Sequence, residues 1–145
     1  MKVSIEEISR DHEEEIIIRC HELNDDILKL LSKLEMKNTM ILGYDDDNIH
    51  RIRIADVYYF EAVDNRVFIY CKDKVLESKH KLYELEEICE GMKFFRASKS
   101  SILNIKKILS VRPSISGRFE AKLDNGESVV ISRQYVPVLK KMLDL

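Results

Sequence analysis

One segment of the chain, residues 94–104 (FFRASKSSILN), interleaves cations and hydroxyls with apolar side chains. Arg96 and Lys99 supply the positive charge, and Ser98 and Ser100 supply hydroxyl groups beside it. Lysine and arginine neutralise phosphates, while hydroxyls and backbone amides at a turn add further hydrogen-bond donors. The phenylalanines and aliphatic residues on either side would anchor the segment in a core. This composition suits the binding of phosphates better than it suits catalysis.

A second cation, Arg133, lies in residues 130–135 (VISRQY), where an expected strand runs out and the last helix begins. An arginine at such a corner projects from a rigid support, and its guanidinium can hydrogen-bond to base edges in a DNA groove. Alternatives stay open for other cations in this part of the chain. Arg96 could be structural and pair with an internal carboxylate such as Glu61, and Lys106–Lys107 could merely solubilise a strand.

The charge is distributed unevenly along the chain, although the net value is only −2. Residues 91–145 contain 11 lysines and arginines against 4 acidic residues, whereas residues 1–38 contain 6 against 10 and residues 39–90 contain 7 against 12. A local excess of positive charge matters more for binding a polyanion than the total charge does. The last third of the chain is therefore the part expected to bind nucleic acid, and a simple bias in solvated charge is the alternative.

No pattern of an enzyme or of a metal site stands out. Cys20 and His21 are adjacent on an expected strand, so their side chains would point to opposite faces and could not form a catalytic pair. Counting a calcium-binding loop from Asp45 places His50 where such a loop needs glycine. The four glycines are spread apart, which leaves no glycine-rich loop for a nucleotide. We expect no catalytic residue, no metal and no cofactor.

The chain is expected to work in the cytoplasm. Its three cysteines are odd in number and widely separated, which fits neither a disulfide framework nor a CxxC metal site. No apolar run approaches the roughly 20 residues that a membrane-spanning helix requires. The start of the chain also lacks the apolar core of a signal peptide.

Residues 1–38 are expected to form a strand-strand-helix extension. Residues 2–8 alternate between apolar and polar side chains and residues 16–18 are β-branched, which predicts two strands. Asn24 is a good N-cap for a helix whose apolar residues, ending at Leu34, fall at helical spacing. This apolar stripe would pack either on the same chain or on a second copy, so the extension is a candidate dimerisation element.

Residues 39–145 are expected to form a mainly β domain, a β-rich α+β fold of antiparallel strands with short helices. Short strands bounded by turn residues are predicted at 40–44, 49–54, 57–61, 66–71 and 74–77. A helix from residue 78 or 79 to residue 90 should end at Gly91. More strands and a C-terminal helix follow, with Pro137 tolerable only in the first turn of that helix.

The last hairpin can be closed at Asp124–Gly126 by either two or three residues. A loop of three residues with Gly126 in the left-handed conformation would set Ala121 opposite Val129 and Phe119 opposite Ile131. This register brings the apolar residues of both strands onto one face, so it is the one we predict.

Several separated segments together resemble the LytTR family of bacterial DNA-binding domains. The matching segments are residues 54–61, 65–70, 82–89, 94–104 and 130–135. The family pattern F-x-R-x-H-x-S-x-x-V-N appears here as residues 94–104 (FFRASKSSILN), with Ser98 where the family often has histidine. The resemblance covers about residues 39–145, which is nearly the whole expected domain.

The resemblance implies an elongated arrangement of β-sheets that binds double-stranded DNA through loops and regulates transcription. Carried over by position, the contacting loops fall at Asn65–Arg66, at Lys99 and at Arg133. Lesser candidates lie in the same signature segment: Arg96, Ser98 and Ser100. Asn104 is expected to brace the backbone and not to touch DNA.

The resemblance also implies partners. Family DNA sites typically come as paired repeats in promoters, which favours a homodimer, and similar short regulators are linked to membrane proteins that restrain them. A phosphate-accepting receiver domain would not fit into residues 1–38. The competing interpretation is a protein-interaction module that acts through the acidic extension without sequence-specific DNA binding. Binding of single-stranded nucleic acid is a third hypothesis, but it would need exposed aromatic residues on which bases can stack.

Overall fold

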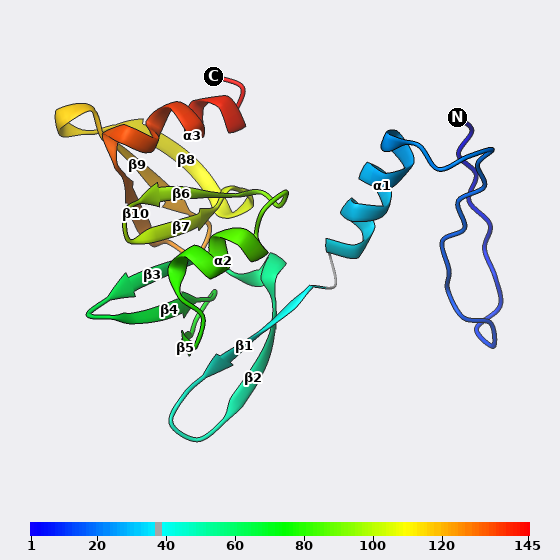
Figure 1. Cartoon of the computed structure of the whole chain (residues 1–145), viewed down its shortest axis with the longest axis horizontal. Helices are drawn as coiled ribbons and strands as arrows, with labels where there is room; N and C mark the ends of the chain where they lie inside the picture. The colour runs from blue at the N-terminus through cyan, green and yellow to red at the C-terminus, as the bar shows by residue number, and fades with distance from the viewer. Residues whose placement is uncertain (37–38) are drawn as a thin grey trace.

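The computed structural model describes residues 1–36 and 39–145. Ten strands form two antiparallel sheets, and the chain before them carries one helix (Figure 1). The larger sheet has the order β2-β1-β5-β4-β3-β7-β6 and the smaller has the order β10-β9-β8. The mainly β fold predicted from the strand pattern is therefore confirmed.

The bounds of the elements are as follows. The larger sheet contains β1 (Met40–Tyr44), β2 (Ile49–Arg53), β3 (Tyr59–Val63), β4 (Arg66–Tyr70), β5 (Val75–Ser78), β6 (Phe94–Ser98) and β7 (Ser101–Asn104). The smaller sheet contains β8 (Ile108–Pro113), β9 (Phe119–Leu123) and β10 (Ser128–Ile131). The α-helices are α1 (Asp25–Met36), α2 (Leu82–Ile88) and α3 (Val136–Met142). Short 3-10 helices are η1 (Ile54–Asp56), η2 (Ile105–Lys107), η3 (Ile115–Gly117) and η4 (Arg133–Tyr135).

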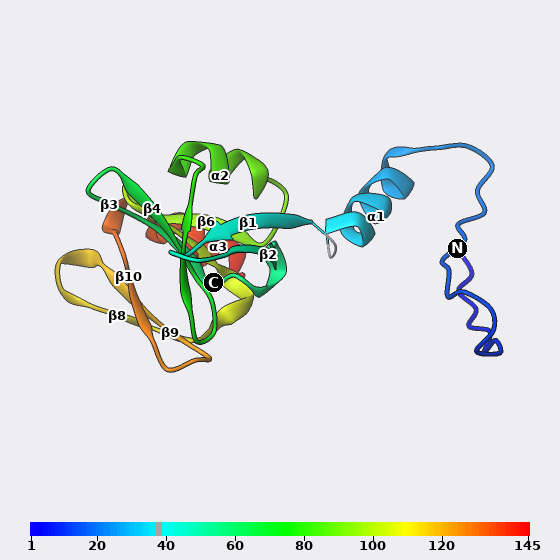
Figure 2. The same ribbon diagram turned by 90° about the horizontal axis from the view of Figure 1, so that it is seen from below.

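Strands β3 and β7 are buried on both faces, because neighbouring residues on each strand point into different cores. Phe60 and Ile102 pack in one core beneath α2. Tyr59 and Leu103 pack in the other core, against β9, β10 and α3. Figure 2 shows α2 and the smaller sheet on opposite sides of the larger sheet. Other layers therefore cover both faces of β7 and of the first residues of β3.

Two polar braces join the layers at the end of the sheet where β7 finishes. Asn104, only 1% exposed, donates from its side-chain amide to the carbonyl of Val57 at 2.9 Å, and its Oδ1 accepts from the N–H of Lys106 at 3.1 Å. The Tyr58 hydroxyl donates to the Asp124 carboxylate in the β9–β10 turn. This hydrogen bond, together with burial, raises the pKa of Tyr58 to about 12. The backbone-bracing role predicted for Asn104 is confirmed.

The last hairpin has the predicted register. Ala121 lies opposite Val129 and Phe119 opposite Ile131. Gly126 adopts a φ of 90°, in the left-handed region that favours glycine. The other predicted elements of the domain shift by a few residues: α2 begins only at Leu82, because Ser78 belongs to β5 and Lys81 is the N-cap.

The extension differs from its prediction. The helix is confirmed, and Asn24 caps it by accepting the Ile27 N–H at 3.0 Å. The two predicted strands, at residues 2–8 and 16–18, are wrong, because the chain there forms no β-ladder. An alternating segment forms a strand only where another strand or layer accepts it, and no other element accepts or covers these segments.

Candidate nucleic-acid interface

Three chain reversals lie together at one end of the strands of the larger sheet, where β3 and β6 finish and β4 and β7 begin. They are the β3–β4 turn at Asp64–Asn65, the β6–β7 turn at Lys99–Ser100 and the corner after β10 at Ser132–Arg133. We call this end of the strands, with its three reversals, the tip edge. In Figure 1 it lies along the left side of the domain.

Two backbone hydrogen bonds between the reversals hold the tip edge together. Ala62, just before the first turn, donates its N–H to the carbonyl of Ser100 at 2.8 Å. Ser132 donates its N–H to the carbonyl of Ala97 at 2.8 Å. The second bond is possible because a β-bulge at Ala97 takes this residue out of the β6–β7 ladder. Segments more than 30 residues apart in the sequence are thus joined at adjacent positions.

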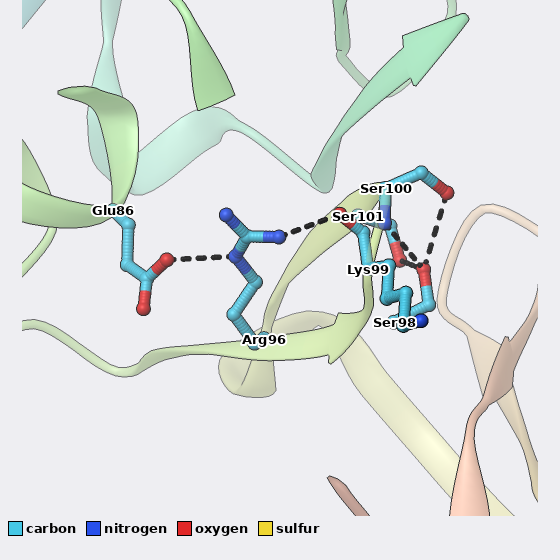
Figure 3. A network of polar contacts seen from close by, with 6 residues as sticks. All are labelled: Glu86, Arg96, Ser98, Lys99, Ser100 and Ser101. Carbon is cyan, nitrogen blue, oxygen red and sulfur yellow. Dashed lines mark hydrogen bonds and ion pairs between the residues drawn. The ribbon is translucent and has the colours of Figure 1, made fainter. Parts of the chain in front are cut away.

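The β6–β7 turn is shaped by its own serines (Figure 3). The Ser98 hydroxyl accepts the Ser100 N–H at 3.2 Å and lies 2.7 Å from the Ser101 hydroxyl. Ser98 is half-buried, whereas Lys99 and Ser100 are exposed. Among the predicted DNA contacts in this turn, Lys99 and Ser100 therefore face outward. The Ser98 hydroxyl instead forms hydrogen bonds within the turn.

Arg96, on β6, forms hydrogen bonds both to α2 and to the same turn. Its Nε donates to the Glu86 carboxylate at 2.7 Å, and its Nη1 donates to the Lys99 carbonyl at 2.6 Å (Figure 3). The side chain is 19% exposed. The structural alternative considered for Arg96 is therefore correct in kind, but its partner is Glu86 on α2 and not Glu61. The two hydrogen bonds of Arg96 thus connect the β6–β7 turn to α2.

Arg66 and Asn65 occupy the β3–β4 turn region. Arg66 makes a two-pronged ion pair with Glu77 on β5, with N–O distances of 3.0 and 2.7 Å. The guanidinium lowers the pKa of Glu77 below its usual range. Asn65 is exposed at the turn and adopts a φ of 64°, a left-handed conformation that asparagine tolerates. Asn65 is therefore available at the tip edge, whereas Arg66 would have to exchange Glu77 for another anion.

Arg133 is exposed, and its side chain lies across the β8–β9 loop. A Cβ added at Gly117 would come within 2.7 Å of the Arg133 Cδ, so the absence of a side chain at Gly117 makes room for the arginine. Arg118 follows Gly117 and is also exposed. Among the described residues, Lys99, Arg118 and Arg133 have no ion-pair partner.

Sequence reasoning did not assign Arg118 to the site. The residue counted toward the basic last third of the chain, but it belongs to no matched motif. Phe119 pairs with Ile131, so Arg118 lies beside Ser132 at the start of the corner. The predicted hairpin register was the signal that could have placed Arg118 next to Arg133.

Lys106 and Lys107 lie at the other end of the sheet. They form η2 directly after Asn104, whereas the tip edge is where β7 begins. The Lys107 ammonium is 5.0 Å from the centre of the Tyr58 ring, a cation–π contact. The structure therefore separates these two lysines from Lys99 and Arg133, and the basic residues of the last third do not form one cluster.

Two features are absent from the part of the chain that the structure describes. No group of three or more histidine, cysteine, aspartate or glutamate residues within it is arranged to hold a metal ion. None of its helices combines the length and the apolar character needed to cross a membrane.

Comparisons with known proteins give a consistent result. The family model of the LytTr DNA-binding domain matches residues 47–144. HTH-type transcriptional regulators of Staphylococcus aureus, from strains bovine RF122 / ET3-1 and MSSA476, are each 28% identical over 148 residues and cover 100% of this chain and 99% of their own length. Among solved structures, the LytTr DNA-binding domain of a Bacillus cereus protein described as a methyl-accepting/DNA response regulator superimposes with a TM-score of 0.70. It is 25% identical and covers 74% of this chain and 99% of that one.

Proposed function

This chain belongs to the LytTr DNA-binding domain family, and on that premise we propose that it is a transcriptional regulator that binds double-stranded DNA sequence-specifically through loops. The observation that carries the proposal is the tip edge, where two backbone hydrogen bonds bring three reversals together. Each reversal presents exposed polar side chains, among them Asn65, Lys99 and Arg133.

The chemistry of the three side chains divides into two tasks. Lys99 is a compact charge suited to a phosphate, and Arg118 beside the corner can serve a second phosphate. The guanidinium of Arg133 carries paired donors, which match the edge of guanine in the major groove. The amide of Asn65 carries a donor and an acceptor, which match the edge of adenine. Such base contacts specify sequence, while the phosphate contacts fix the position of the domain on the duplex.

Loops suit this task better than the helices of the domain do. Helices α2 and α3 are seven residues long and are separated along the chain by five strands, so they do not form a helix-turn-helix. The surface of α2 carries Glu84, Glu86 and Glu87, which would repel phosphates. The loop-mediated mode is therefore the one that the electrostatics favours.

Selection from a library of randomised duplexes, followed by fluorescence anisotropy, tests the proposal. We expect one enriched sequence and a linear fall of log K with log salt concentration. Single-stranded poly-dT should compete poorly with the selected duplex, because the aromatic residues of the domain lie mainly in its cores. A library without enrichment, or equal competition by poly-dT, would contradict sequence-specific duplex binding.

Gly117→Ala is expected to weaken DNA binding about ten-fold, which corresponds to about 1.4 kcal/mol. The new methyl group would collide with the Arg133 side chain, and Gly117 has a φ of 75° that alanine adopts only with strain. Gly126→Ala is the matched control, because Gly126 also has a positive φ but an added Cβ there meets no atom within 4 Å. Both variants should lose stability in urea unfolding, and only Gly117→Ala should lose affinity. Equal affinities of the two variants would show that Arg133 does not depend on Gly117.

We further propose that the protein acts as a homodimer on paired repeats in promoters, in the cytoplasm. Three side chains form a small contact surface, and a second linked module raises the apparent affinity through effective concentration. A membrane protein that restrains the regulator is a prediction from the family resemblance alone. Affinity purification of the tagged regulator from detergent-solubilised membranes, followed by mass spectrometry, would test it.

A further inference from the structure

The N-terminal extension leaves a set of apolar side chains in water. Val3 is 85% exposed and Ile5 is 93% exposed, and Ile16 and Ile17 are 73% and 62% exposed. Isolated apolar residues on a surface are common, but Val3 and Ile5 lie on the same side of one extended segment, and exposed apolar side chains that lie together mark a surface that associates. The domain does not cover them in the described structure.

The apolar face of the first segment of the extension, formed by Val3 and Ile5, is exposed to solvent. The two segments of the extension run alongside each other without a β-ladder (Figure 1). The hollow between them is lined mostly by polar residues, among them Lys2, Ser4 and Glu6. Val3 and Ile5 do not line it, as the alternation of an extended chain requires. The hollow therefore does not bury the apolar face.

We propose that the first segment, residues 2–6, pairs antiparallel with the same segment of a second copy, with Ser4 on the two-fold axis. In this register Lys2 of each copy lies opposite Glu6 of the other, and Val3 lies opposite Ile5. Opposite charges and apolar pairs directly across two strands both stabilise a ladder. The pairing rests on the proposed homodimer but not on DNA binding.

Other registers are less favourable. A shift of one position sets Val3 opposite Ser4 or Glu6, and a dyad at Ile5 sets Val3 opposite Glu7. A parallel arrangement would place Lys2 against Lys2 and Glu6 against Glu6. Only the dyad at Ser4 matches both kinds of pair. This self-complementarity selects a second copy of the chain as the partner, because an isologous contact must satisfy both strands with one sequence.

The extension lies outside the segment that matches the family model of the DNA-binding domain, residues 47–144. The solved LytTr domain from Bacillus cereus covers 74% of the chain, whereas the Staphylococcus aureus regulators align with all of it. With 6 cations against 10 acidic residues, residues 1–38 would be repelled by DNA and are free to serve association.

Disulfide trapping of the full-length chain tests the register. Residues directly opposite each other in an antiparallel pair have Cα atoms about 4.5–5.5 Å apart, within reach of a disulfide. In a Cys20→Ser background, Ser4→Cys should therefore form a covalent dimer under mild oxidation at least ten-fold faster than Ser9→Cys. Two copies of residue 9 would be separated by about ten strand positions, or about 34 Å. Equal rates for the two cysteines would overturn the register.

Charge exchange provides the second test, measured by sedimentation equilibrium. Lys2→Glu and Glu6→Lys should each raise the dimer dissociation constant about ten-fold, because each places like charges opposite each other twice in the symmetric pair. The double variant should return to within three-fold of wild type, and Ile5→Lys should be monomeric. A wild-type chain that is monomeric, or a double variant as weak as the single ones, would overturn the pairing. Affinity for a single DNA repeat should be unchanged in all variants, which separates failure of the dimer from failure of DNA binding.

Discussion

Arg133→Ala is expected to lower the affinity for the selected duplex by about 5- to 150-fold, because a two-pronged arginine–guanine contact is worth about 1–3 kcal/mol. The loss should be concentrated at one base pair, so that substitutions at that base pair no longer weaken the variant further. The physical reason is that Arg133 is exposed at a supported corner and has no ion-pair partner among the described residues.

Lys99→Ala should behave differently in the same anisotropy titrations. A phosphate contact carries no sequence information, so binding should weaken about equally for all duplexes, and the slope of log K against log salt should fall by about one. Lys106→Ala is the matched control, since it removes the same exposed charge at the opposite end of the sheet. If Lys106→Ala weakened binding as much as Lys99→Ala, the tip edge would not be the contacting surface.

Asn104→Ala is expected to destabilise the domain by about 2–4 kcal/mol, since each buried polar group left without a partner costs about 1–3 kcal/mol. The side chain of Asn104 bonds to the carbonyl of Val57 at 2.9 Å, to that of Ala55 at 3.4 Å and to the N–H of Lys106 at 3.1 Å. Alanine would remove all three bonds, and the Val57 carbonyl is the partner that would stay buried without them, at a place where two layers meet. Urea unfolding should show a lower midpoint with an unchanged slope.

Two variants serve as controls for Asn104. Asn104→Asp keeps an acceptor for Lys106 but loses the donors, so it should be as destabilising as alanine or more so, because the carboxylate would face the Val57 carbonyl. Asn125→Ala removes a half-buried amide whose two hydrogen bonds, to the Lys72 carbonyl at 3.3 Å and from the Glu127 N–H at 3.0 Å, both lie at the surface, and its effect should stay within about 0.5 kcal/mol. A loss for Asn125→Ala equal to that for Asn104→Ala would show that burial is not the cause.

Local patterns predicted the elements of the domain because those elements depend on nearby residues. Short apolar runs bounded by turn residues located β1 and β4, and the three-residue loop at Gly126 followed from aligning two apolar faces. The N-cap at Asn24 likewise involves only the first turn of α1. The same patterns failed for residues 2–8 and 16–18, since an alternating sequence forms a strand only where another layer or strand accepts it.

The sequence by itself determined the mainly β architecture, the hairpin register and the identity of Asn65, Lys99 and Arg133 as exposed polar residues at chain reversals. Only the tertiary structure decided which of these chain segments lie side by side. The bond from Ser132 to Ala97 needs a bulge in β6, and the partner of Arg96 depends on where α2 packs, which placed Glu86 and not Glu61 within reach. Packing also separated Lys106 and Lys107 from the tip edge. Contacts between residues far apart in the chain are set by how whole layers fit together, and no local pattern encodes that fit.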